Sequence, residues 1–165
     1  MNFAKETFLR NEFIPLMRTL QPVAHRRWGV MNPQQMVEHF SETMRMANGR
    51  LVLPIYTSDD DLKKMRMFML SERPFRENTK NPIMGEVPEP VKLESLAAAV
   101  DELENELDIF FETFSANPDQ LTVNPIFGYL ARLNPGTEEY NNALKEITSR
   151  TSFTSGGSRF YDKSA

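Results

Sequence analysis

The sequence predicts an all-α protein built as a helical bundle, on the strength of three observations. Hydrophobic residues recur every three or four positions in four or five segments, which is the spacing of amphipathic helices. Strand signals are weak, and residues 51–56 are the one candidate strand. The chain has 165 residues, of which 40% are hydrophobic and 25% charged, as in a single globular domain. We expect residues 1–147 to form this domain and residues 148–165 to form a flexible tail.

The first two expected helices lie in the N-terminal third of the chain. Residues 3–20 carry an apolar side at helical spacing, and Pro15 is expected to kink or end this helix because proline lacks the backbone donor. The second helix has the clearest start in the sequence. Asn32 suits its N-cap, a proline occupies the first helical position, and Gln35 falls where a capping-box partner belongs. Apolar residues then recur at helical spacing until Gly49, which is expected to end the helix.

Two further helices and a long loop are expected in the middle of the chain. Residues 59–70 predict a short helix, with Ser58 as its cap and three aspartates near the positive end of the helix dipole. Residues 71–92 contain four prolines and no steady period, which predicts a long loop. Residues 95–115 predict the longest helix, with one continuous apolar stripe and an acidic face that we expect to be solvated. The acidic residues are Glu102, Glu104, Glu106, Asp108 and Glu112.

The C-terminal part of the chain gives weaker signals. Residues 124–130 read Asn-Pro-Ile-Phe-Gly-Tyr-Leu, a turn-rich apolar segment. A last short helix is expected over residues 137–147. After Ser149 the hydrophobic period is lost, and the serines and glycines that follow are typical of a flexible tail.

Composition excludes several classes of function. The chain has no cysteine, which excludes disulfides, cysteine-ligated zinc and thiol nucleophiles, and fits a reducing compartment. No segment has the length and apolarity of a signal peptide or a membrane helix. The net charge is −4, and Arg26-Arg27 is the densest basic cluster, whereas nucleic-acid surfaces show clustered lysine and arginine. We therefore expect a cytoplasmic protein with no membrane partner and no nucleic-acid partner.

The two histidines are the residues that could carry metal chemistry, because histidine is the obvious transition-metal ligand in a chain without cysteine. His39 lies on the second expected helix, three residues after Met36, at the edge of its buried face. A packed structural histidine is the alternative interpretation of this position. His25 lies in the loop that enters the helix, where we expect it to be exposed or to pack on Trp28, the only tryptophan, which we expect to cover the end of the bundle.

Residues 28–39, Trp-Gly-Val-Met-Asn-Pro-Gln-Gln-Met-Val-Glu-His, resemble the entry to the metal-binding helix of the DinB/YfiT-like superfamily. Within it the chain is most similar to a small, uncharacterised bacterial subgroup, which residues 124–130 also resemble. The resemblance covers roughly residues 1–130 and implies a four-helix bundle. It also implies a divalent metal, zinc or nickel, held by three histidines, of which His39 matches the first. A metal-dependent hydrolase or thiol transferase lineage, a small-molecule substrate and a homodimer are further implications.

The sequence departs from this family after the second helix, since no histidine follows His39. A single histidine cannot hold zinc in the usual three-ligand arrangement, and Glu138, Glu139 and Glu146 have no special claim to replace the missing ligands. We therefore expect an incomplete metal site and a last helix that is truncated or disordered. Thr-Ser occurs three times over residues 148–155, as a one-nucleotide shift of a histidine-rich helix would encode, so we hypothesise that the tail is out of frame.

Two other functions stay open at this level. The first is a non-catalytic helical bundle that acts as a binding or dimerisation module, with an adaptable surface formed by the methionines of the second and third helices. About half of these methionines are expected in the core. They are Met36, Met44, Met46, Met65, Met67 and Met69. The second is a pocket for a small molecule, without metal, under the loop of residues 71–92.

Overall fold

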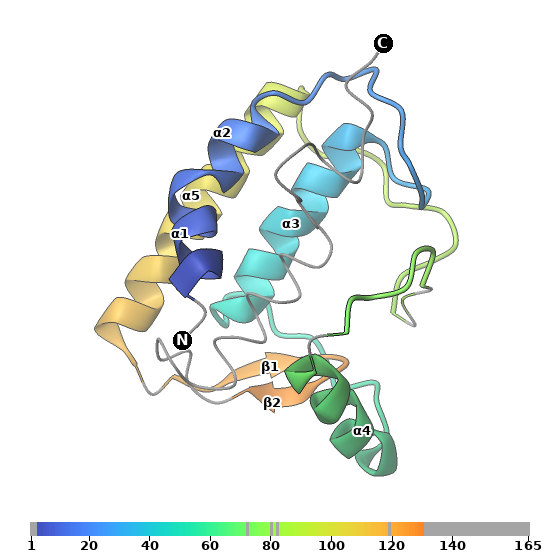
Figure 1. Ribbon diagram of the computed structural model, residues 1–165, viewed down its shortest axis with the longest axis vertical. Helices are drawn as coiled ribbons and strands as arrows, with labels where there is room; N and C mark the ends of the chain where they lie inside the picture. Colours follow the sequence, from blue (N-terminus) through green and yellow to red (C-terminus); the bar gives the residue numbers. More distant parts are fainter. Residues whose placement is uncertain (1–2, 72, 80, 82, 119, 131–165) are drawn as a thin grey trace.

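The structure, a computed structural model, describes residues 3–71, 73–79, 81, 83–118 and 120–130 (Figure 1). This part of the chain is mostly helical, as predicted. The expected helix over residues 137–147 and the tail of residues 148–165 lie outside it. Its elements, in chain order, are α1 (Phe3–Asn11), α2 (Phe13–Met17), α3 (Pro33–Ala47), α4 (Asp59–Leu70), α5 (Leu96–Ala116), β1 (Thr122–Asn124) and β2 (Gly128–Leu130).

The break between α1 and α2 follows from Pro15. The backbone nitrogen of Glu12 still donates to the Phe8 carbonyl at 2.9 Å, and that of Leu16 donates to the Glu12 carbonyl at 3.0 Å. Proline has no N–H to offer the carbonyl four residues earlier, which is that of Asn11, the last residue of α1. The predicted interruption of the first helix is confirmed.

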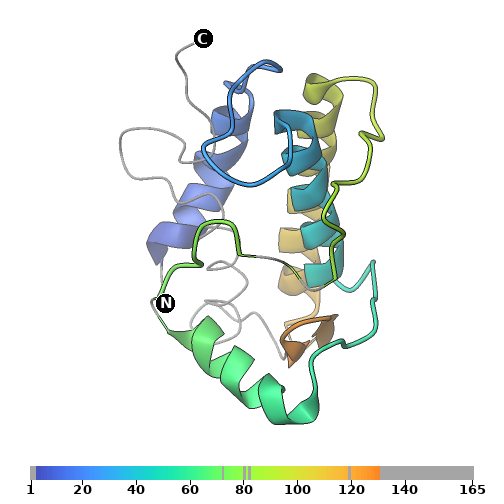
Figure 2. The same cartoon turned by 90° about the vertical axis from the view of Figure 1, so that its right-hand side faces the viewer.

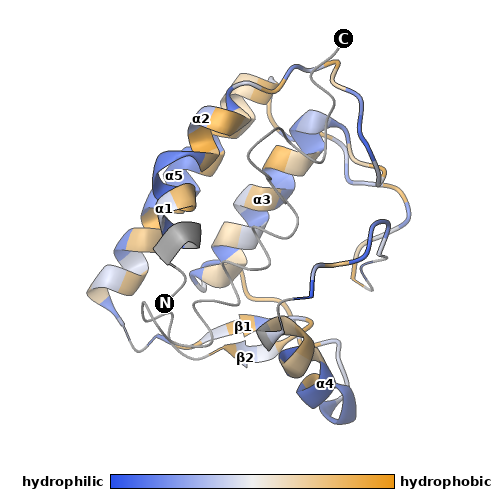
Figure 3. Cartoon of the chain, viewed as in Figure 1, coloured by the Kyte–Doolittle hydropathy of each residue, from blue (hydrophilic) through white to orange (hydrophobic). Residues whose placement is uncertain are grey.

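Three helical segments surround one hydrophobic core. Helices α3 and α5 lie side by side, and α2 contacts α5. The turned view shows α1 and α2, in blue, as a separate layer beside the teal α3 and the yellow α5 (Figure 2), and apolar residues recur along α2 and α5 (Figure 3). The buried core consists of Leu9, Phe13, Ile14, Met17, Met36, Val37, Phe40, Met44, Leu96, Ala99, Val100, Leu103, Leu107, Phe110 and Phe114.

The start and end of α3 match the sequence prediction residue by residue. Asn32 Oδ1 accepts from the Gln35 backbone nitrogen at 2.8 Å, and Gln35 Oε1 accepts from the Asn32 backbone nitrogen at 2.9 Å, which completes the capping box. The helix ends at Ala47, and Gly49 follows with a φ of +81°, the left-handed position that glycine favours after a helix. A β-carbon on Gly49 would also lie 3.1 Å from Gln120 Nε2.

Helix α4 has the predicted bounds, but its cap differs from the prediction. Ser58 occupies the N-cap position and makes no side-chain cap hydrogen bond. Its hydroxyl donates instead to Asp61 Oδ2 at 3.0 Å. The Ser58 hydroxyl therefore binds an aspartate of the first turn and does not cap the helix backbone as predicted.

The strand prediction is wrong in its position. Strands β1 and β2 form an antiparallel hairpin at residues 122–130, while residues 51–56 form no strand. Asn124 Oδ1 accepts from the backbone nitrogens of Ile126 and Phe127 at 2.9 and 3.0 Å, and this turn brings the two strands together. Residues 51–56 alternate between half-buried and exposed, but Pro54 has no backbone donor for a ladder.

Helix α4 packs on this hairpin at one end of the molecule (Figure 1). Arg66 donates to the carbonyl oxygens of Phe127 at 3.3 Å and Tyr129 at 2.8 Å. The φ of Gly128 is +77°, and a β-carbon there would lie 3.2 Å from the Leu62 side chain. A glycine at this position therefore lets α4 approach the strand closely. No helix in the described part of the chain is long and apolar enough to cross a membrane.

Candidate functional site

His39 lies in the middle of α3, beside the core face of that helix. It is half-buried and precedes Phe40, which is buried and meets Phe13 edge-on at 5.7 Å between ring centroids. The His39 carbonyl accepts from Thr43 Oγ1 at 3.0 Å. The predicted location, at the edge of the buried face, is therefore what the structure has.

The described residues do not supply a complete set of metal ligands around this histidine. No three histidine, aspartate or glutamate side chains among them converge closely enough to hold an ion. The nearest carboxylates along α3 have other partners: Glu38 binds the segment before α5, and Glu42 Oε1 lies 2.5 Å from Lys92 Nζ. His25 is exposed on the loop before α3. Glu138, Glu139 and Glu146 lie outside the described residues.

The acidic face of α5 is not uniformly solvated, which corrects the sequence prediction. Glu104, Asp108 and Glu112 are exposed, but Glu106 is buried, with 3% of its side chain accessible. Arg45 Nε donates to Glu106 Oε1 at 2.8 Å, and Arg50 Nη1 donates to Oε2 at 2.7 Å. Both carboxylate oxygens are therefore satisfied by guanidinium groups, as a buried charge requires.

Arg45 extends this ion pair into a small network between α3 and α5. Its second nitrogen, Nη2, donates to Glu102 Oε1, one turn before Glu106. Glu106 lies three residues after Leu103 and four before Phe110, both of which are buried. Glu106 therefore has the helical spacing of the buried apolar stripe. This spacing is the signal in the sequence that could have identified Glu106 as buried. The network thus links α3 and α5 at one defined position along both helices.

Three side chains on the outward face of α3 hold the extended segment that leads into α5. Glu38 accepts from the backbone nitrogens of Lys92 at 2.9 Å and Leu93 at 3.1 Å. Gln34 Nε2 donates to the Leu93 carbonyl at 2.7 Å, and Gln35 Nε2 donates to that of Glu89 at 2.7 Å. We call residues 89–93 the strap. Because the strap forms no strand of its own, α3 supplies the partners for its backbone.

The ionisation of Glu38 reflects this role. Partial burial is the largest single influence on the pKa of Glu38 and acts to raise it. The hydrogen bonds from Gln34 and from the backbone of Lys92 and Leu93, together with the charge of Lys92, outweigh it and lower the pKa below its ordinary value. The ionised carboxylate is therefore the form that holds the strap.

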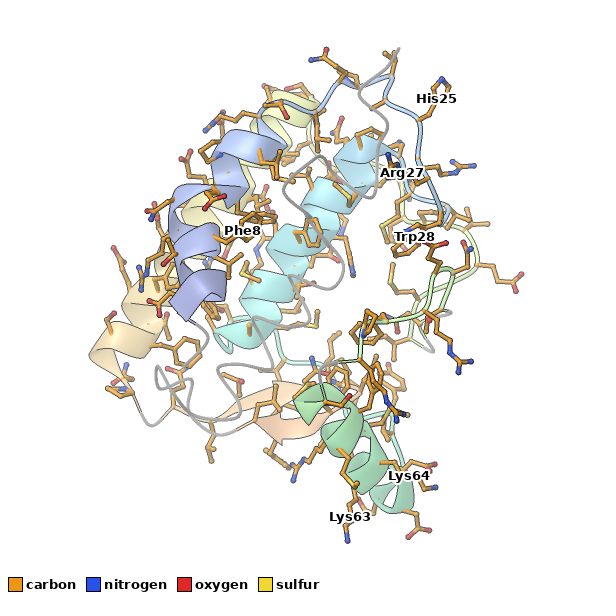
Figure 4. All side chains as sticks on the ribbon, viewed as in Figure 1. Phe8, His25, Arg27, Trp28, Lys63 and Lys64 are labelled. Atoms are coloured by element: carbon orange, nitrogen blue, oxygen red, sulfur yellow. The ribbon has the colours of Figure 1, made fainter. Side chains whose placement is uncertain are left out.

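A pocket of about 420 Å³ lies where the loop after α2 meets the start of α3. His25 and Arg26 line it together with apolar residues of the same loop. Trp28 follows and is half-buried against the core, which agrees with a packing role for this side chain. Figure 4 shows His25 on the outer stretch of this loop, with Arg27 and Trp28 farther along it.

The structure does not bring the two sequence-predicted histidines into one site. His25 lines the pocket at the start of α3, to which Pro33 also belongs. His39 lies six residues after Pro33, which is about 9 Å from Pro33 along the helix axis. Sequence reasoning did not identify the buried Glu106 network or the strap. In comparisons with known proteins, no protein-family model, no curated protein and no solved structure matches the chain.

Proposed function

We propose that this chain is a DinB/YfiT-like helical bundle from a lineage of metal-dependent hydrolases or transferases, and that its metal site is incomplete. The packing of α1 and α2, α3 and α5 around one core supports the proposal, because the helices of a four-helix bundle share a single core in this way. The last helix of the bundle is the one expected over residues 137–147, which lie outside the described part of the chain.

The observation that carries the proposal is the position of His39. It sits half-buried at mid-helix on α3, next to a residue of the core, where the resemblance places the first of three histidine ligands. A zinc or nickel ion needs at least two further ligands, and the described residues around His39 do not fit that requirement. We therefore derive no catalytic step from a metal at this position.

Titration of the purified chain with Ni²⁺ or Zn²⁺ tests this proposal. We expect weak binding that is retained less than stoichiometrically after gel filtration, because one imidazole leaves most coordination positions to water. Replacing His39 with alanine should abolish this residual binding. The matched control is His25→Ala, since His25 is the only other histidine and is exposed, and it should leave binding unchanged.

Two results would contradict the proposal in different ways. Tight, stoichiometric binding by the unaltered chain would mean that the site is complete. Weak binding that survives His39→Ala but disappears in His25→Ala would remove His39 as a ligand and with it the evidence for a metalloenzyme lineage. Thermal melting of both variants shows whether each is folded.

A second candidate function, a non-catalytic binding or dimerisation module, is favoured by the surface of α4. Of the six methionines on α3 and α4, Met36, Met44 and Met69 are buried and Met46 is half-buried. Met65 and Met67 are exposed, and 63% of Met67 is accessible. The long, unbranched side chain of methionine suits an adaptable contact surface.

This alternative predicts a change in oligomeric state. If α4 forms a dimer contact, Met67→Lys should convert a dimer to a monomer in sedimentation or light-scattering measurements, because the contact would then bury an unpaired charge. Val87→Lys is the matched control, since Val87 is also exposed but lies in the loop before the strap. A monomer at all concentrations, or a dimer that tolerates Met67→Lys, would exclude α4 as the interface.

A further inference from the structure

Arginines without an ionic partner gather on two loops of the molecule. Six of the described lysine and arginine side chains pair with carboxylates, and Arg66 donates to the hairpin. Among the side chains that the structure describes, four exposed arginines have no carboxylate partner, and Lys63 on α4 has none either. The four are Arg26, Arg27, Arg73 and Arg76.

One hydrogen bond joins the two loops that carry these arginines. The backbone nitrogen of Gly29 donates to Asn78 Oδ1 at 2.9 Å. Both residues have positive φ, +79° for Gly29 and +56° for Asn78, and asparagine is one of the few residues with a side chain that accept this conformation. Arg27 precedes Gly29 by two residues in the sequence, and Arg76 precedes Asn78 by two. The bond therefore joins the loop of Arg26 and Arg27 to the loop of Arg76 and Glu77, and we call these residues the charged corner.

The pocket before α3 includes one of these arginines, Arg26, in its lining. Arg26 lines it, and the only hydrogen bond of the Arg26 guanidinium among the described residues is a long one, 3.5 Å from Nη1 to the Val30 carbonyl. His25 lines the pocket as well and is exposed. The other residues that line it are Pro22, Val23, Ala24, Met31, Asn32 and Pro33. The pocket thus combines apolar side chains with polar ones, among them a guanidinium group that lacks a strong acceptor.

We propose that this pocket binds a small organic anion, with the apolar body of the ligand in the pocket and its anionic group on the Arg26 guanidinium. A volume of about 420 Å³ accommodates a small ligand. The chain carries a net charge of −4, so an anion is repelled by most of the surface and attracted to this corner. Guanidinium groups bind carboxylate and phosphate through paired hydrogen bonds.

Fluorescence of Trp28 provides a direct test, because it is the only tryptophan and lies on the pocket loop. Three probes separate the contributions: octanoate has both an apolar body and a charge, octanamide has the body alone, and inorganic phosphate has a charge alone. We expect saturable 1:1 binding of octanoate, and binding about tenfold weaker for octanamide and for phosphate, since a hydrogen bond to a charged group contributes about 1.5 kcal/mol or more. The octanoate affinity should fall as salt is added.

Paired substitutions locate the site. Arg26→Gln should weaken octanoate binding about tenfold, while Lys63→Gln, which removes the unpaired cation on α4, should leave it unchanged. Both residues are exposed, so the melting temperature of each variant should match that of the unaltered chain. Equal binding of octanoate and octanamide, equal effects of the two substitutions, or no saturable change in fluorescence would each overturn the proposal.

Discussion

Replacing Glu106 with alanine is expected to lower the free energy of unfolding by about 3 kcal/mol, because Arg50 loses its carboxylate partner and Arg45 keeps only Glu102. Arg45 and Arg50 keep 31% and 48% of their side chains accessible, so water relieves part of the cost and the effect falls at the lower end for a broken buried pair. Urea unfolding followed by circular dichroism measures the change.

Asp108→Ala is the matched control for this substitution. Asp108 lies two residues farther along α5, is acidic and is exposed, so its removal should change stability by less than about 0.5 kcal/mol. A Glu106→Ala variant as stable as the control would show that the Arg45–Glu106–Arg50 network contributes no net stability to the contact between α3 and α5.

Replacing Glu38 with alanine is expected to destabilise the protein by about 2 kcal/mol and to release the strap. Three donors lose an ionised acceptor: the Gln34 side chain and the backbone nitrogens of Lys92 and Leu93. Hydrogen bonds to charged groups contribute about 1.5–3 kcal/mol each, but the strap amides can turn to water once freed, which keeps the sum low. Amide hydrogen exchange should show lost protection at residues 92 and 93 while α5 stays protected.

Glu42→Ala provides the comparison for Glu38→Ala. Glu42 lies one turn farther along α3 and contacts the same lysine, but only through the Lys92 ammonium group. A partly exposed ion pair of this kind contributes less than about 1 kcal/mol. Loss of strap protection in both variants would mean that charge attraction to Lys92, and not the backbone hydrogen bonds, holds the strap.

The contribution of Glu38 should depend on pH in one direction. Its folded-state pKa lies below the ordinary value of about 4.5, so the unfolded chain takes up the proton first as the pH falls. The stabilisation is therefore fully present above about pH 4.5 and is lost as the pH falls through the lowered pKa. The difference in unfolding free energy between the unaltered chain and Glu38→Ala should shrink over that interval and stay constant from pH 5 to 8.

The helices could be predicted from sequence because their signals are local. A capping residue, a proline and a glycine predict the two ends of α3 to within one helical turn. Hydrophobic spacing is enough to locate α4 and α5. The hairpin at residues 122–130 was missed because its strands have only three residues each, too few to establish a period of two. Its turn residues, Asn124 and Gly128, were the available signal, and they predicted only a turn.

The candidate sites were harder to predict because their partners are distant in sequence. In the sequence Glu106 resembles any other glutamate on an acidic helix, and only the packing of α3 brings Arg45 against it. The loops of Arg26 and Arg76 are likewise distant in sequence and are joined by the bond between Gly29 and Asn78. His39, by contrast, was identified from sequence together with its place beside the core. A complete metal site at His39 would need further ligands, and the sequence around it supplies none.

The separation of α3 and α5 along the chain has a consequence for how the protein folds. Arg45 and Glu106 are 61 positions apart, so the chain must close a long loop before the two helices meet. The entropy of that closure is lost before any core contact between α3 and α5 repays it, and such non-local contacts slow folding. We therefore expect the meeting of these two helices, and not the growth of either one, to limit the folding rate.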